Sequence, residues 1–321
     1  MKQASLFRCG YPKRRYPRPA LKRRGMGRDL GLAVRMVVAL VPLVALYLLA
    51  LVITVLSLIA LLVDGSWIAL LGWFFLAAGL VVVAASHWVR AEDLVLRAAR
   101  AKRLDDGEEP ELRQIVDRVA ATADVPPPRL ALIRSWAPNA LAAGLRSESA
   151  TIAVTTELLR RLDEPELEAV VAHELAHVAN RDGLVMTFVS GPAMLGSAMW
   201  GSSDGRGQVF YVIFYWPVHL IGLLLLWTIS RYREYVADRG AVLITGAPEQ
   251  LMSALTKISE RTPRGDLRGG AAVSALCVVP AQRKTRFEAL KRFEVFMDHP
   301  KLEKRLERLS DLARYLGEPA P

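Results

Sequence analysis

Residues 163–177 read DEPELEAVVAHELAH, and this stretch decides both the fold and the chemistry that the sequence predicts. Asp163 is a good N-cap, Pro165 suits the first helical turn, and Glu166 stands three residues after the cap, as a capping box requires. Apolar residues then recur at helical spacing, namely Leu167, Val170, Val171, Leu175 and Val178. We predict a helix that begins here and ends at Gly183, unless it continues into the apolar run that follows.

His173 and His177 are four residues apart on this helix, so their side chains lie on one face, roughly 6 Å from each other. Both imidazoles can then reach one tetrahedral zinc ion. Glu174 is offset by one position and stands beside the metal, where a base can take a proton from metal-bound water. The alternative is a chance match, which would bury three polar side chains at a cost of several kcal/mol each without partners.

A catalytic zinc site needs a third protein ligand. A histidine at position 183 would be one solution, but that residue is Gly183. His87 and His219 lie inside apolar runs, where a packing role is the simpler interpretation. Glu234 is the best candidate, and Asp238 shares its helix face and could accept a hydrogen bond from a ligand imidazole. Exposed helices also carry Glu and Asp at this spacing, so spacing alone leaves both interpretations open.

The hydrophobic residues, 52% of the 321, are strongly segregated along the chain. Four runs are free of Lys, Arg, Asp and Glu and approach or exceed the length of about 20 residues that a membrane helix needs: 36–63, 67–89, 184–200 and 210–229. The loop at 64–66 has no basic residue and the loop at 201–208 has only Arg206, whereas basic residues flank the outer ends of both pairs. We therefore predict transmembrane hairpins at 31–89 and 184–229, with their chain ends in the cytosol.

The two polar stretches, 90–183 and 230–321, then lie on one side of the membrane and can form one cytosolic domain. The basic arm 1–30 accounts for nearly all of the net charge of +10. It either attracts anionic lipid headgroups or serves as a topology signal in a disordered tail. Cys9 and Cys277 are expected to be reduced thiols without a disulfide.

Short strands are predicted between the first hairpin and the metal-binding helix. Arg129–Ile133 and Thr151–Thr155 have strand-like composition, and Asn139–Leu145 could be an edge strand that pairs with the second of them. A helix precedes these strands, because Leu112, Ile115, Val116 and Val119 recur at helical spacing before a run of prolines.

Several motifs together resemble the HtpX-like membrane metalloproteases, which are relatives of the CAAX prenyl proteases. The resemblance rests on His173–Asp182, on Ser230–Asp238 beyond a membrane hairpin, on Pro138–Gly144, and on His299-Pro300 with the following Glu303–Leu306 and Leu309. It covers the chain from the first apolar run to about residue 310. Two features depart from the family, namely Leu141 in place of an aromatic residue and the long basic arm.

The resemblance implies roles for individual residues. His173, His177 and Glu234 would be the ligands of one zinc ion per chain, Glu174 the general base, and Asp238 a hydrogen-bond partner of a ligand. The segment with Asn139, Ala140, Leu141 and Ala142 would bind an extended substrate through its backbone. His299 would stabilise the oxyanion of the intermediate, unless it is a surface histidine beside a proline turn.

The sequence thus predicts a mainly α protein with a small β-sheet: a four-helix transmembrane part and a cytosolic zincin-like (gluzincin) protease domain. We expect a multi-pass plasma-membrane endopeptidase whose partners are lipids and polypeptide substrates, with no specific nucleic acid. By resemblance, its substrates are damaged or misfolded membrane proteins. The alternatives are a processing protease for a dedicated, lipidated substrate, and a zinc-stabilised membrane scaffold without catalysis.

Overall fold

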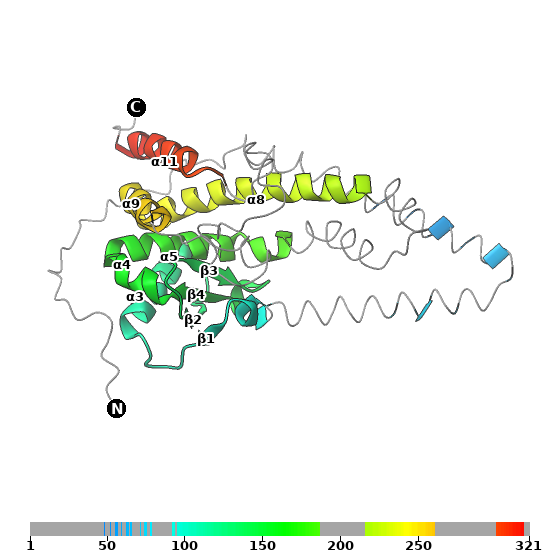
Figure 1. Ribbon diagram of the computed structural model, residues 1–321, viewed down its shortest axis with the longest axis horizontal. Helices are drawn as coiled ribbons and strands as arrows, with labels where there is room; N and C mark the ends of the chain where they lie inside the picture. Colours follow the sequence, from blue (N-terminus) through cyan, green and yellow to red (C-terminus); the bar gives the residue numbers. More distant parts are fainter. Residues whose placement is uncertain are drawn as a thin grey trace. The chain divides into compact units, whose positions relative to one another are not determined.

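The computed structural model describes residues 92–93, 95–186, 216–260 and 300–317, together with scattered positions between 48 and 78 (Figure 1). No helix within these residues combines the length and apolar character needed to cross a bilayer. The basic arm, most of the predicted membrane runs, His87, His299 and both cysteines lie outside the described part. The described residues 92–93, 95–186, 226–260 and 300–317 belong to one compact unit, which contains all the elements analysed below except residues 216–225.

A four-stranded mixed sheet lies in this unit, with the strand order β1-β2-β4-β3. Its strands are β1 (Ala101–Arg103), β2 (Arg129–Ile133), β3 (Ala140–Ala143) and β4 (Thr151–Thr155). β2 and β4 are parallel, whereas β1 and β3 run antiparallel to their neighbours. The prediction of an edge strand paired with Thr151–Thr155 is therefore confirmed.

The alternation of side chains along the strands divides the core into two parts. On one face, Ile152 and Val154 of β4 join the main apolar cluster with the helices. On the other face, Ala153 and Leu141 pack in a smaller cluster with Leu96. This alternation turns Ala140 of β3 toward the helical face and Leu141 away from it.

Helices α3 (Pro110–Ala123), α4 (Thr156–Arg161) and α5 (Glu164–Ala179) cover the main face of the sheet. The predicted capping box of α5 is present, because the Asp163 side chain accepts a hydrogen bond from the Glu166 N–H and the Glu166 side chain accepts one from the Asp163 N–H. Eleven of the sixteen residues of α5 are buried, so this helix runs through the centre of the unit.

The carboxyl-terminal part of the unit consists of α8 (Trp216–Thr245), α9 (Pro248–Ser259) and α11 (Leu302–Gly317). Helix α9 packs on both α5 and α11. Helix α8 approaches α5 very closely, since a Cβ atom built on Gly240 would lie 2.7 Å from the Cβ of Ala176. Only a glycine can therefore occupy position 240 without displacing one of the two helices.

Two details of the fold differ from the prediction. Helix α5 ends at Ala179 rather than at Gly183, because Arg181 adopts a left-handed backbone with φ of 55° and a new helical turn starts at residue 182. Gly183 is needed for another reason, since a Cβ there would lie 2.4 Å from the carbonyl oxygen of Gly144. Strand β1 was not predicted: it is three residues long, and its two basic residues are exposed.

The close approach of α8 and α5 predicts an unusual effect of Gly240→Ala. In a solvent-exposed helix this change would stabilise the folded protein by about 1 kcal/mol. Here the added methyl group meets the methyl group of Ala176, which cannot rotate out of the way. Overpacking of this kind costs about 1–3 kcal/mol. We therefore expect a lower melting temperature in thermal unfolding. Gly317→Ala in α11 is the matched control, because no atom of the described residues lies within 4 Å of its added methyl, and it should be neutral or stabilising.

Candidate metal centre

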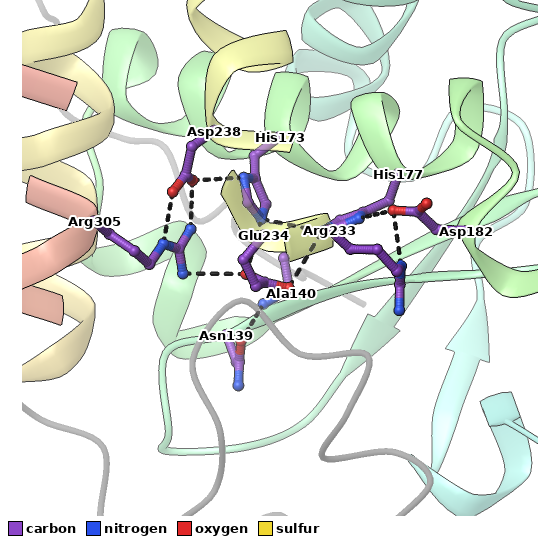
Figure 2. A network of polar contacts seen from close by, with 9 residues as sticks. All are labelled: Asn139, Ala140, His173, His177, Asp182, Arg233, Glu234, Asp238 and Arg305. Carbon is purple, nitrogen blue, oxygen red and sulfur yellow. Dashed lines mark hydrogen bonds and ion pairs between the residues drawn. The ribbon is translucent and has the colours of Figure 1, made fainter. Parts of the chain in front are cut away.

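Three side chains from two helices converge on one point (Figure 2). The Nε2 atoms of His173 and His177, both on α5, face each other at 3.2 Å. Glu234 of α8 places Oε2 3.6 Å from His173 Nε2 and Oε1 3.6 Å from His177 Nε2. The candidate ligand atoms of all three residues lie within 4.8 Å of one another. The structure thus brings together the three residues that the sequence proposed as metal ligands.

These separations suit a tetrahedral divalent ion. Two ligand atoms that are each about 2.1 Å from one such ion lie about 3.4 Å from each other. The distances of 3.2 and 3.6 Å between the candidate donor atoms are close to this value. His173 and Glu234 are also almost fully buried. Two imidazoles and one carboxylate in this arrangement can hold a metal ion and leave a fourth position for water.

Each imidazole has a carboxylate behind it. His177 Nδ1 lies 2.5 Å from Asp182 Oδ2, in hydrogen-bond geometry. His173 Nδ1 lies 3.0 Å from Asp238 Oδ1, a hydrogen-bond distance, although the ring nitrogen is not well aligned with that oxygen. An acceptor at Nδ1 keeps the proton there and leaves Nε2 as the metal donor. Both rings therefore present Nε2 to the same point.

Each of these carboxylates is in turn held by an arginine (Figure 2). Arg233 Nε lies 3.0 Å from Asp182 Oδ2. Arg305 of α11 donates hydrogen bonds from Nε and Nη2 to the two oxygens of Asp238, at 2.8 and 2.5 Å. Sequence reasoning proposed Asp238 but missed Asp182 and both arginines as members of the site.

The buried charges around the histidines do not balance without a cation. Four buried carboxylates, those of Glu174, Asp182, Glu234 and Asp238, face the two buried guanidinium groups of Arg233 and Arg305. With neutral imidazoles, two negative charges remain in excess. A divalent metal ion supplies the matching charge, so the electrostatics as well as the geometry of these residues fit a metal.

The pKa values of the metal-free cluster agree with this balance. Burial alone would lower the pKa of His173, but Asp238 and Glu234 raise it to about 9. Burial raises the pKa of Glu174 to about 8, and the nearby Glu234 adds to this shift. Although burial would raise the pKa of Asp238, Arg305 and His173 hold it below its usual range. At neutral pH, protons on His173 and Glu174 thus take the place of the missing positive charges.

Glu174 is poised differently from the other carboxylates. It is 1% exposed, and neither of its oxygens makes a hydrogen bond of good geometry within the described residues. The N–H of Ala142 on β3 nevertheless lies close enough to lower its pKa in part. When a metal ion balances the negative charge, this buried carboxylate without a firm partner would be available to accept a proton.

The edge strand β3 lies beside α5 and carries the remaining predicted residues. The Thr155 N–H donates to the Asn139 carbonyl at 2.9 Å, so by the alternation of an antiparallel ladder Leu141 also bonds to β4. The backbone groups of Ala140 and Ala142 then point to the open side. Asn139 is buried, and its Oδ1 accepts the N–H of Ala140. Of these residues, Ala142 lines the pocket described next.

A small pocket, partly open to solvent, adjoins the metal point. Its lining includes Glu174, His177 and Glu234 together with Ala142. Exposed Arg146 and Arg181 lie at its rim. An extended peptide that pairs with β3 can therefore reach the base and the candidate ligands together.

Comparisons with known proteins give a consistent result. The sequence matches peptidase family M48 over residues 106–313. The protease HtpX homolog of Moorella thermoacetica is 36% identical over 313 residues, which cover 92% of this chain and 99% of that protein. Protease HtpX homolog 1 of Streptomyces coelicolor is 38% identical, over 80% of this chain and 89% of the relative.

Among solved structures, the crystal structure of S. mikatae Ste24p matches 87% of this chain and 67% of its own, with 18% identity and a TM-score of 0.47. The range matched by the family, residues 106–313, contains the whole candidate metal centre. This chain belongs to peptidase family M48 and is a relative of the HtpX proteases.

Proposed function

We propose that this chain is a membrane-bound zinc endopeptidase that hydrolyses peptide bonds of membrane or misfolded proteins. The observation that carries the proposal is the convergence of His173, His177 and Glu234 on one point beside the buried carboxylate of Glu174. Membership of a peptidase family supports the reaction class. The two-histidine, one-carboxylate donor set supports zinc as the metal, with one ion per chain.

Zinc bound by His173, His177 and Glu234 would supply an activated water and polarise the carbonyl of the scissile bond. Glu174 accepts the proton of that water and later delivers it to the nitrogen of the leaving amine, so that the carboxylate is regenerated. Asp182 and Asp238 keep each imidazole in the tautomer that presents Nε2. His299 lies outside the described residues, and its role at the oxyanion stays a prediction.

The substrate would lie as an added strand along β3. The outward backbone groups of Ala140 and Ala142 would pair with the peptide main chain, which gives affinity with little dependence on sequence. Because Asn139 Oδ1 accepts the Ala140 N–H, a peptide would pair with the Ala140 carbonyl or displace this hydrogen bond, and the Leu141 side chain packs in the smaller core cluster on the opposite face. Broad sequence tolerance suits an enzyme that removes damaged proteins.

The membrane location and the cytosolic orientation rest on the apolar runs and on the distribution of Lys and Arg. The protease names of the relatives support proteolysis, and the open edge of β3 favours general substrates over a single dedicated one. Processing of a dedicated, lipidated substrate is the alternative within the class. A zinc-stabilised scaffold without catalysis is the alternative outside it, and the buried carboxylate of Glu174, which makes no hydrogen bond of good geometry within the described residues, argues against that function.

Glu174→Gln separates catalysis from metal binding. We expect the variant to retain about one zinc per chain, because Glu174 is not a ligand, and to lose a factor of roughly 10²–10⁴ in cleavage, because its amide cannot take the proton. Metal analysis of detergent-purified protein and cleavage of casein, of a model membrane protein and of the chain itself measure both properties.

Glu168→Gln is the matched control, since it makes the same chemical change on the same helix at a half-exposed side chain paired with Arg118. It should leave cleavage unchanged. Normal proteolysis by Glu174→Gln would remove the proposed mechanism, whereas a wild-type chain that binds zinc but cleaves none of these substrates would favour the scaffold.

Zinc binding should release protons. Below about pH 9 His173 is protonated in the metal-free site, and below about pH 8 Glu174 is protonated as well. Zinc requires a neutral imidazole, so its affinity should fall as the pH is lowered below these values and level off above them. At pH 7 we expect the release of about one to two protons per zinc bound, measured by isothermal titration calorimetry in buffers of different ionisation enthalpy.

Glu174→Gln provides an internal check on this count, because it removes one of the two titrating groups near the ion. Its proton release should drop to about one. An affinity that stays constant between about pH 6 and 9 would contradict the charge balance described for the cluster.

A further inference from the structure

Arg305 is an unusual residue for its place in the fold. It lies on α11, on the apolar stripe formed by Leu302, Leu309 and Leu312, and it is only 3% exposed. A leucine at this position would continue the stripe and pack against the core. A buried ion pair is seldom better for stability than a well-packed apolar side chain. The guanidinium group therefore points to a role beyond holding α11 in place.

The contacts of Arg305 involve both acidic residues of α8 (Figure 2). Its Nε and Nη2 bind the two oxygens of Asp238 in a bidentate pair. Its Nη1 lies 3.3 Å from Oε2 of Glu234, the proposed third ligand. One rigid, planar group thus fixes two carboxylates that stand one helical turn apart.

These two carboxylates govern the metal site in different ways. Asp238 stands behind His173, whereas Glu234 contributes a ligand oxygen of its own. With Oε2 of Glu234 beside Arg305, Oε1 remains the oxygen nearest to His177 Nε2, at 3.6 Å. The orientation of Arg305 therefore affects two of the three ligands at once.

The other histidine has a comparable arrangement nearby. Arg233 lies against Asp182, which binds the Nδ1 of His177. Arg233 comes from α8 itself, whereas Arg305 comes from a helix that is separate in sequence. The contact between Arg305 and Asp238, and through it the position of His173, thus depends on the packing of α11 against the rest of the unit.

We propose that Arg305 is a positioning residue of the metal centre: its bidentate pair holds Asp238 against His173, and its Nη1 orients the carboxylate of Glu234. This inference deepens the proposed function and rests on it. In this role Arg305 acts through the two carboxylates.

Arg305→Lys tests the geometry at constant charge. Lysine retains the positive charge but has a single donor group and cannot form the fork. We expect zinc affinity, measured by competition with a chelator, to fall by about 10–100-fold, as for other partners of metal ligands. The visible absorption of bound Co²⁺, which reports coordination geometry, should change, and kcat should fall while KM stays close to the wild-type value.

Leu309→Ala is the matched control, because Leu309 is buried one helical turn further along α11 and makes no polar contact with the centre. It should lower the melting temperature while zinc affinity and the Co²⁺ spectrum stay at wild-type values. An equal loss of zinc affinity in Leu309→Ala and Arg305→Lys would overturn the inference, since Arg305 would then only help to dock the helix.

Wild-type zinc affinity and an unchanged Co²⁺ spectrum in Arg305→Lys would also overturn the inference, because a positive charge alone would then be enough to position the two carboxylates. A wild-type chain that binds no zinc would instead overturn the proposed function, and this inference with it. The two failures are therefore distinguishable by the behaviour of the wild-type protein.

Discussion

The structure depends on the neutralisation of carboxylates inside an apolar interior. Isolated charges at such depth cost several kcal/mol each, and the cluster around His173 and His177 contains four carboxylates against two arginines. The helices α5, α8 and α11 can pack together only if that excess is compensated by a cation or by protons. Metal binding and folding of this unit are therefore thermodynamically linked, because the core cannot pack fully until the charge of the site is compensated.

The same constraint explains why the helices lie so close together. Donor atoms must come within about 4 Å of one another to share an ion, and α5 and α8 achieve this where Gly240 faces Ala176, next to His177. The buried strand β4 and the edge strand β3 support α5 from the other side. The fold brings an open strand edge, a base and three donors together in one small region, which is the arrangement that peptide hydrolysis requires.

Local signals carried most of what the sequence could predict. The capping box at Asp163 and the spacing of His173 and His177 depend on a single helix, and the structure has both as expected. The prediction of Glu234 as a ligand required the further assumption that the stretches 90–183 and 230–321 fold into one unit. Asp182 lies only five residues after His177, but it reaches the ring because Arg181 turns the chain into a left-handed conformation, which helical spacing does not anticipate. One feature of the sequence pointed to Arg305, namely its charge within the apolar stripe of α11. Its partners, Asp238 and Glu234, are visible only in the tertiary structure.

The polar groups of the centre also follow an order along the chain. The helix with both imidazoles comes first, the segment with Glu234 and Asp238 second, and the guanidinium of Arg305 last. During synthesis on the ribosome, a nascent chain therefore carries the histidines and the base well before it carries the group that secures their partners. A metal centre built in this order completes its contacts only when α11 has been synthesised, so Glu234 and Asp238 lack the arginine that holds them until almost the whole unit is present.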